Sequence, residues 1–382
     1  MNSESGAANA DGPRKARYIM VGGFLGAGKT TAVCRLARHF TEQGLRVGLI
    51  TNDQGNQLVD TAMLASNGFS VEEISGGCFC CRFNSLVDAA KKLSADTRPD
   101  VFIAEPVGSC TDLVATMSYP LRRIYGEQFE IAPLSVLVDP VRAQRVFGLT
   151  EGGRFSEKVT YIYRKQLEEA DLIVINKREL LTEPEMIGLR ATLDEAFPGK
   201  EILEMSARSG DGLEPWFQSI TTGRQSAHPA MTVDYEIYAE GEALLGWLNA
   251  TVALRASTAF DGNLALREFA AALQSRLMAA GAEIAHLKMT LDPDGGIGDL
   301  AVINLVRNDY VAELSQELQD ALESGQLIVN IRAEVGADLL KSALDESLKS
   351  CFGEGRAAQA TLEHLEFFQP GKPQPTHRIA TP

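Results

Sequence analysis

The sequence predicts an α/β domain with a mostly parallel sheet, followed by a smaller α+β domain of the ferredoxin-like type. Three observations predict this fold class. Over residues 17–222, short Val/Ile/Leu-rich runs alternate with amphipathic helical patterns, as in a parallel sheet covered by helices on both faces. A segment of small and polar residues at 223–231 is typical of a linker. Over 232–350 the order becomes strand, helix, strand, strand, helix, strand, which is the split βαβ arrangement.

The first domain is expected to pair each strand with a following helix. Its first strand, 17–22, ends in glycines and leads into a helix at 29–43, whose apolar residues recur at helical spacing. Parallel strands end at one edge of their sheet, and ligands bind there. The further strands are expected at 46–51, 100–104, 134–138, 172–175 and 201–205, and the further helices near 111–125, 155–169, 183–196 and 213–219.

In the second domain, a strand at 232–239 and a helix at 337–349 are expected to flank the split βαβ unit. Residues 1–16, rich in small residues, are expected to form a flexible tail, and residues 351–382, rich in proline and polar residues, a loosely held one. The expected core elements are a strand at 245–256, a helix at 263–280, strands at 284–291 and 300–306, a helix at 310–324 and a strand at 327–331.

Composition and charge exclude several classes of function. The chain has 36 basic and 51 acidic residues, a net charge of −15, so it lacks the positive charge that binding nucleic acid requires. Its apolar runs stay well short of the roughly 18 residues of a membrane span, and residues 1–16 have no apolar core of a secretory signal. Six cysteines are too few for a disulfide scaffold. We therefore expect a cytoplasmic protein without nucleic-acid or membrane partners, in which clustered cysteines indicate metal or redox chemistry.

The strongest motif is GFLGAGKT at residues 23–30, which matches G-x-x-x-x-G-K-[ST] between an expected strand and an expected helix. Its glycines let successive backbone N–H groups point at phosphate oxygens, and the helix N-terminus adds its positive dipole. Lys29 is expected to reach the β- and γ-phosphates and the Thr30 hydroxyl to bind Mg²⁺. The residues predicted to hold the nucleotide here are Gly23, Gly26, Ala27, Gly28, Lys29, Thr30 and Thr31.

Two further strand ends carry residues that suit a nucleotide site. Glu105 ends one strand and can hold Mg²⁺ through water, and Gly108 can offer its N–H to a γ-phosphate, although acids at strand ends are common. After another strand, the sequence from Asn176 to Glu179, NKRE, resembles the N-K-x-D motif that binds guanine, and a solvated turn is the alternative. The Glu179 carboxylate would accept from the base, and the stem of Lys177 would pack on the ring. Backbone groups of Ser206 and Ala207 could close the base pocket.

Three cysteines, Cys78, Cys80 and Cys81, lie on one glycine-preceded loop. Their thiolates can converge on one soft ion, and because Zn²⁺ prefers four tetrahedral ligands, three thiolates leave one position open. An open position suits a site that transfers metal. The alternatives are buried apolar thiols, a redox pair or persulfide chemistry.

A phosphate loop followed by C-x-C-C, E-x-x-G and N-K-x-D, in that order, resembles the CobW-like GTPases, relatives of the HypB and UreG metallochaperones. The resemblance covers about residues 17–220. It implies a P-loop GTPase domain in which the cysteine loop binds Zn²⁺ or a similar ion, with GTP hydrolysis linked to metal delivery. It also makes Asp53 a candidate for organising Mg²⁺ or the attacking water, and Glu73 a candidate additional metal ligand. Glu179 departs from the usual Asp of the family.

The predicted function is Mg²⁺-dependent GTP hydrolysis coupled to binding and delivery of a transition metal, Zn²⁺ or Co²⁺. Lys29, Asp53 and Glu105 are the candidate catalytic residues. The expected cofactors are GTP, Mg²⁺ and the transition metal. The expected partners are a client metalloprotein and, as one candidate assembly, a second copy of the chain. Two alternatives stay open: a nucleotide-gated chaperone of a cofactor enzyme, such as a corrinoid enzyme, with a structural zinc, and a non-hydrolysing nucleotide- and metal-binding protein.

Overall fold

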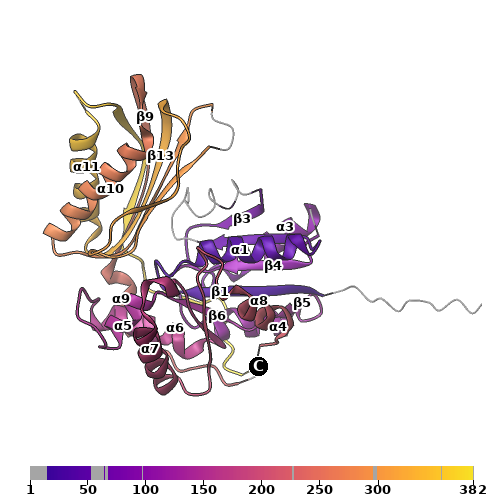
Figure 1. Cartoon of the computed structure of the whole chain (residues 1–382). Helices are drawn as coiled ribbons and strands as arrows, with labels where there is room; N and C mark the ends of the chain where they lie inside the picture. The colour runs from indigo at the N-terminus through magenta and orange to yellow at the C-terminus, as the bar shows by residue number, and fades with distance from the viewer. Residues whose placement is uncertain are drawn as a thin grey trace, which may run out of the picture.

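A computed structural model describes residues 15–52, 64, 68–96, 98–225, 228–295, 299–353 and 355–381. The chain folds around two separate sheets, one above the other in Figure 1. The first has the strand order β3-β2-β4-β1-β6-β7-β8, with β5 beside β1, and all its described pairs are parallel. The second has the order β12-β11-β10-β13-β9-β14 and is antiparallel. The predicted fold class is confirmed.

The elements around the first sheet follow the expected alternation and add several short ones. They are β1 (Ala16–Gly23), α1 (Lys29–Glu42), β2 (Val47–Asn52), β3 (Ser70–Ile74), α3 (Phe83–Asp96), β4 (Val101–Glu105), the π-helical turn η1 (Val114–Ser118), α4 (Tyr119–Tyr125), β5 (Phe129–Ile131), β6 (Ser135–Val138), α5 (Pro140–Val146), α6 (Glu157–Glu169), β7 (Leu172–Ile175), the 3₁₀ turn η2 (Arg178–Leu180), α7 (Glu183–Ala196), β8 (Glu201–Glu204), α8 (Leu213–Thr222) and α9 (Tyr235–Leu244).

Both faces of the first sheet are buried, which explains its continuous apolar strands. Alternate residues of β1 point to opposite faces: Tyr18 and Met20 join the core under α3, α6 and α7, whereas Ile19 and Val21 join the core under α1 and α8. The carboxyl ends of β1, β2 and β4 are therefore held side by side by packing on both faces. These ends carry the phosphate loop, Asn52 and Glu105.

The second sheet has the split βαβ order with an added hairpin. Its elements are β9 (Leu245–Phe260), α10 (Gly262–Ala279), β10 (Glu283–Pro293), β11 (Ala301–Leu305), β12 (Glu313–Gln316), β13 (Leu322–Glu334), α11 (Ala337–Cys351) and β14 (Gln359–Phe368). Strands β9, β10, β13 and β14 with helices α10 and α11 form the ferredoxin-like unit, and β11 and β12 are inserted between β10 and β13. The two helices cover one face of this sheet, and its apolar core lies beneath them.

Two expected elements of this half are wrong. The expected helix at 310–324 is instead β12 and the start of β13, because β12 pairs with β11, and Leu322 and Ser324 pair with β9. The expected strand at 232–239 is instead helix α9, packed beside α6. The Asp234 side chain accepts hydrogen bonds from the backbone N–H groups of Glu236 and Ile237, at 2.9 and 3.2 Å, and so caps this helix.

The end of the chain is also ordered differently from the expected loosely held tail. Residues 359–368 form β14, which pairs with β9. The following residues 369–381, the C-terminal strap, return to the first domain, where Figure 1 places the C-terminus. Within the strap, the backbone N–H of Thr376 donates to the Cys80 carbonyl at 2.8 Å, and that of Ile379 donates to the Ala115 carbonyl at 2.8 Å.

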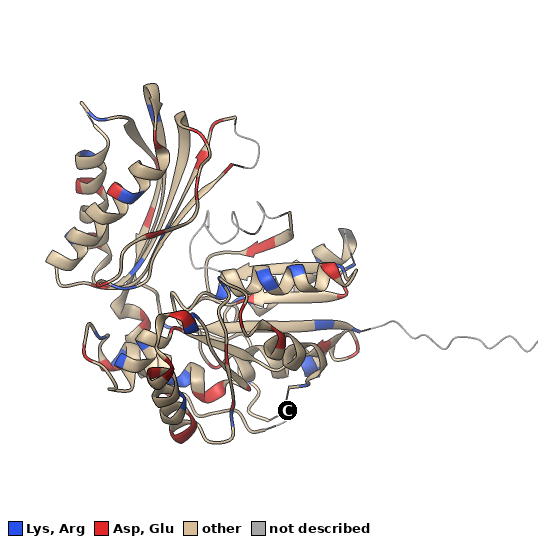
Figure 2. Cartoon of the chain, viewed as in Figure 1, with Lys and Arg blue, Asp and Glu red and all other residues tan. Residues whose placement is uncertain are grey.

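Acidic and basic residues are interspersed over both halves of the described chain, as Figure 2 shows. None of the helices in those parts combines the length and the apolar composition that crossing a membrane requires.

Candidate functional site

The loop between β1 and α1 has the conformation that phosphate binding requires. Gly28, at the start of α1, has a φ of 89°, a left-handed conformation that glycine adopts without strain. A Cβ atom at this position would lie 2.4 Å from Asn176 Nδ2, so only glycine fits. The Lys29 side chain is buried under the loop, with its Nζ 3.5 Å from the Phe24 carbonyl oxygen. The glycines thus hold the loop open beside the helix N-terminus, where an anion is favoured.

Thr30, in the first turn of α1, faces Glu105 at the end of β4. The Thr30 hydroxyl donates to Glu105 Oε1 at 3.1 Å, and both residues are buried. A hydroxyl and a carboxylate are oxygen ligands of the kind that Mg²⁺ takes beside a nucleotide, directly or through water, so the residues present fit that ion. Gly108 lies close by, since a Cβ there would be 2.8 Å from the side chain of Leu25 in the phosphate loop.

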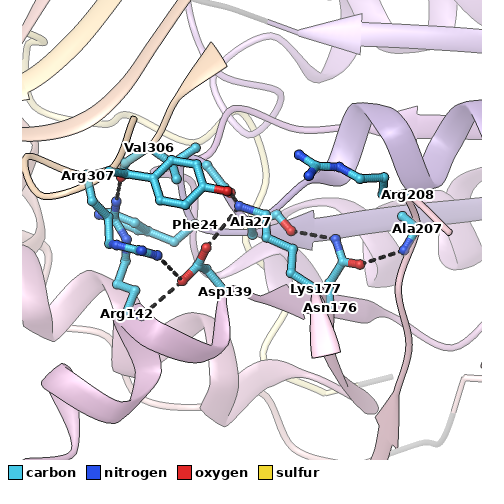
Figure 3. A network of polar contacts seen from close by, with 12 residues as sticks. Phe24, Ala27, Asp139, Arg142, Asn176, Lys177, Ala207, Arg208, Val306 and Arg307 are labelled. Atoms are coloured by element: carbon cyan, nitrogen blue, oxygen red, sulfur yellow. Dashed lines mark hydrogen bonds and ion pairs between the residues drawn. The ribbon is translucent and has the colours of Figure 1, made fainter. Parts of the chain in front are cut away.

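The residues predicted to contact the base surround the other end of the phosphate loop (Figure 3). Asn176 Nδ2 donates to the Ala27 carbonyl at 2.8 Å, and Asn176 Oδ1 accepts from the Ala207 N–H at 2.9 Å. Lys177 Nζ donates to the Gly26 carbonyl at 2.7 Å. Asn176 therefore ties the phosphate loop to the Ser206–Ala207 loop. Glu179 is exposed on η2.

Asp139, which sequence reasoning missed, anchors the lysine of this motif. The carboxylate is almost fully buried and accepts from Lys177 Nζ at 2.9 Å and from the Arg142 backbone N–H at 2.9 Å, and Arg307 Nη1 lies 3.4 Å away (Figure 3). Although burial opposes ionisation, the positive charges of Lys177, Arg307 and Arg142 hold the pKa of Asp139 well below its usual range. The only signal in the sequence was an acid directly after a buried strand.

A cavity of about 780 Å³ lies between the two domains. The second sheet contributes the face that α10 and α11 leave uncovered: Leu287 and Met289 of β10 join the core, so His286 and Lys288 point to the cavity. Lys288 Nζ donates to the Thr30 hydroxyl at 3.3 Å. The predicted site residues that line the cavity are Gly26, Gly28, Lys29, Thr30, Thr31, Glu105, Gly108, Asn176, Lys177, Glu179 and Ala207.

Cys78, Cys80 and Cys81 converge on the loop that follows β3. Their Sγ atoms are 2.8 Å apart for Cys78 and Cys80, 3.3 Å for Cys78 and Cys81, and 3.8 Å for Cys80 and Cys81. In the described part of the chain, these three cysteines form a group whose ligand atoms all lie within 4.8 Å of one another, close enough to bind one metal ion. Glu73 lies in β3 and is not part of this group. Asp53 lies outside the described residues.

Asn52, at the end of β2, fixes the cysteine loop. Its Nδ2 donates to the carbonyls of Ile74 and Gly77, at 2.9 and 2.8 Å, and its Oδ1 accepts from the Phe79 N–H at 2.8 Å. Asn52 also lines the nucleotide-sized cavity. The cysteine loop and the cavity are therefore joined by one buried side chain.

The thiols of the cluster have different proton affinities. Hydrogen bonds from Cys110, Cys80 and Cys81 lower the pKa of the Cys78 thiol well below its usual range. The hydrogen bond to Cys78 raises the pKa of Cys81 to about 11. A soft cation bound by these sulfurs would release their protons, because metal ligation deprotonates thiols.

Comparisons with known proteins agree with this geometry. Residues 17–204 match the family model described as CobW/HypB/UreG, nucleotide-binding domain. The chain is 29% identical to a zinc chaperone CobW from Sinorhizobium sp, over 46% of this chain and 54% of that protein. It is also 29% identical to the zinc chaperone YeiR from Escherichia coli (strain K12), over 44% of this chain and 48% of that protein. The chain thus spans about half the length of these curated relatives.

Among solved structures, HypB from Helicobacter pylori in complex with nickel is 18% identical, over 56% of this chain and 92% of that chain, with a TM-score of 0.42. The Zn(II)-bound YjiA GTPase from E. coli is 15% identical, over 87% of this chain and 98% of that chain, with a TM-score of 0.39. The family match covers the parallel sheet as far as β8, including the phosphate loop and the cysteine loop. Residues 17–204 are therefore similar to the nucleotide-binding domain of the CobW/HypB/UreG family.

Proposed function

We propose that the protein hydrolyses GTP with Mg²⁺ and uses the nucleotide cycle to hold and release a Zn²⁺- or Co²⁺-type cation at Cys78, Cys80 and Cys81. The observation that carries the proposal is the meeting of two sites at one sheet edge. Asn52 lines the cavity beside the phosphate loop and also makes three hydrogen bonds to the cysteine loop or the residues flanking it. The recipient would be a client metalloprotein.

The hydrolytic half of the proposal rests on positioning and charge. Lys29 would neutralise the β- and γ-phosphates, and the backbone of the phosphate loop would hold their oxygens. Bound Mg²⁺, held through Thr30 and Glu105, would supply further neutralisation of the phosphates. Glu105 accepts from Thr30 and Gly108 packs on the phosphate loop, and this closeness to the loop supports a role for both beside the γ-phosphate.

The first experiment tests the phosphate loop. Lys29→Ala removes a charge-assisted contact worth about 1.5–3 kcal/mol, so GTP affinity should fall by at least tenfold and phosphate release should nearly cease. Lys15→Ala, a lysine outside the loop, serves as the control. GTP binding and hydrolysis by Lys29→Ala at the parent's rate would contradict the proposal.

The second experiment tests guanine recognition by competition between GTP and ATP. Glu179 lines the cavity beside Lys177, and its carboxylate can accept from the N1 and N2 groups of guanine but not from adenine N1. We expect GTP to bind more tightly than ATP, and Glu179→Gln to reduce the difference. Equal affinities in the parent would contradict guanine recognition and leave phosphate binding intact.

The third experiment tests the coupling by anaerobic metal titration with GDP or a GTP analogue. Coupled sites typically change each other's affinity by about 5–150-fold, and the effect is reciprocal. We expect the two nucleotide states to differ in Zn²⁺ affinity within this range, and Zn²⁺ to change GTP affinity by the same factor. Asn52→Ala should reduce that factor, because it removes the side chain that joins the cysteine loop to the cavity. Identical Zn²⁺ affinities in both states would mean that the cysteines form a structural site.

A further inference from the structure

One lysine of the second domain reaches the phosphate loop of the first. Lys288 lies on β10, on the face of the second sheet that α10 and α11 leave uncovered, and its half-buried side chain lines the cavity between the domains. Its Nζ donates to the Thr30 hydroxyl at 3.3 Å. The residues directly opposite it on the neighbouring strands, Asn304 and Asn330, carry uncharged amides. Lys288 therefore brings a positive charge of the second domain to the site expected for Mg²⁺ and the phosphates.

Packing of the second domain on the phosphate loop holds Lys288 near this site. A Cβ atom at Gly26 would lie 3.0 Å from the Val306 side chain and 3.2 Å from the Ala285 carbonyl oxygen. Arg142 Nη2 donates to the Ala285 carbonyl at 3.2 Å. The same nitrogen also donates to the Val306 carbonyl (Figure 3). Ala285 precedes Lys288 by three residues on β10, so the lysine stands on a strand whose first half is fixed against the phosphate loop.

The contact between Lys288 and Thr30 uses an atom that Mg²⁺ would need. The Thr30 hydroxyl donates its one proton to Glu105 Oε1 at 3.1 Å and accepts from Lys288 with a lone pair. Mg²⁺ bound to this oxygen would take a lone pair and would place a second positive charge beside the ammonium. The ammonium would therefore leave Thr30 when the ion binds, and the γ-phosphate that binds with the ion is a negative partner for it.

We propose that Lys288 is a catalytic residue that pairs with the γ-phosphate of bound GTP. This inference rests on the proposed GTPase function and adds a residue of the second domain to its site. Hydrolysis forms a bond between the oxygen of water and the γ-phosphorus and breaks the bond from that phosphorus to the bridging oxygen, whose electron pair stays on GDP. One proton of the water remains on the released phosphate and the other passes to solvent. Lys288 keeps its proton throughout and, together with Lys29, neutralises the negative charge of the transition state.

Two arginines of the second domain also line the cavity, but their contacts stay within that domain. Arg332 Nη1 donates to two backbone carbonyls of its own sheet, at 3.0 and 2.8 Å. Arg267 pairs with Glu317, with 2.7 Å between Nη2 and Oε1. The contact of Lys288 with Thr30 instead crosses from one domain to the other. This difference favours Lys288 over the two arginines as the residue that the γ-phosphate would meet.

The experiment measures nucleotide binding and hydrolysis by the full chain in the presence of Mg²⁺. Lys288→Gln should weaken binding of a non-hydrolysable GTP analogue by about tenfold, change GDP affinity by less than about twofold, and lower kcat by about 100-fold. Lys288→Arg retains the positive charge and should keep most of the parent's preference for the GTP analogue over GDP. Lys341→Gln, on the helix α11 that covers the opposite face of the sheet, is the matched control and should equal the parent in all three quantities.

The GDP affinity of Lys288→Gln separates a specific effect from a general one, because GDP lacks the γ-phosphate. Weakening of GDP and the GTP analogue by the same factor would mean that Lys288 supports the phosphate loop alone, and would overturn the proposal. An affinity for the GTP analogue and a kcat equal to those of the parent would also overturn it and leave the GTPase function standing. A parent that binds GTP without hydrolysing it would instead overturn the proposed function itself.

Discussion

Replacing Asp139 by Asn should destabilise the protein because the change leaves positive charges buried without their partner. Asp139 is 2% exposed at its side chain, Arg307 is 7% and Lys177 is 20%. Removing one partner of a buried ion pair typically costs about 3–5 kcal/mol. Asn retains the size and the helix-capping oxygen that accepts from the Arg142 N–H. Since Lys177 is partly solvated, we expect a loss near the lower limit, about 3 kcal/mol.

The matched control is Asp309→Asn. Asp309 also contacts Arg307, with its Oδ1 3.3 Å from Arg307 Nε, but its side chain is 54% exposed. Exposed ion pairs contribute about 1 kcal/mol or less, so this variant should lose far less stability. Urea unfolding of the parent and both variants at pH 7 measures the difference. Equal losses for Asp139→Asn and Asp309→Asn would refute the reasoning, because burial would then not determine the cost.

The same pair of proteins has an expected pH dependence. Because the pKa of Asp139 is lowered in the folded state, its contribution is fully present above the unfolded pKa of about 4 and is lost as the pH falls below it. Protonated Asp139 is similar to Asn. The stability difference between the parent and Asp139→Asn should therefore shrink between pH 5 and pH 3, and a constant difference would contradict the assignment.

Two further predictions follow from buried or cavity-facing groups. Burial raises the pKa of Glu169 to about 8. Because the folded state then holds a proton that the unfolded state releases, the parent should lose on the order of 4 kcal/mol of stability as the pH rises from about 5 to 8. Urea unfolding of Glu169→Gln should lack this decline. Lys288→Gln should weaken GTP binding about tenfold in calorimetry, because Lys288 Nζ lies 3.3 Å from the Thr30 hydroxyl beside the phosphate loop. Lys341→Gln on α11 is the control, and equal affinities for the two variants would contradict a role of Lys288 in the nucleotide site.

The parts of the site that could be predicted from the sequence are those that one short segment determines. The phosphate loop needs glycines, Lys29 and Thr30 at fixed spacing, and strand, loop and helix are adjacent in the chain. The convergence of Cys78, Cys80 and Cys81 was anticipated for the same reason. Each of these inferences used the spacing of residues along a short segment and the rule that parallel strands end at the same edge of their sheet.

The parts that could not be predicted depend on contacts between distant segments. Lys288 becomes a site residue only when the two domains meet, and Asp139 contacts Lys177 only because β6 and β7 lie side by side in the sheet. The segment at 310–324 has helical spacing, yet sheet pairing outweighs that weak preference. At 232–239 a flanking strand was expected, but the Asp234 cap favours a helix.

The C-terminal strap has a mechanical consequence for the cavity between the domains. The chain crosses from one domain to the other twice, at the junction of α9 and β9 and again after β14. The two crossings run side by side: Phe368 is opposite Trp247 in the β9–β14 pair, and Gln369 Nε2 donates to the Ala243 carbonyl at 2.6 Å. Rotation of the second domain about this connection would twist the two crossing segments around each other and break their pairing. The paired crossings therefore oppose rotation of the second sheet about the connection to the first domain and help to keep its uncovered face over the phosphate loop.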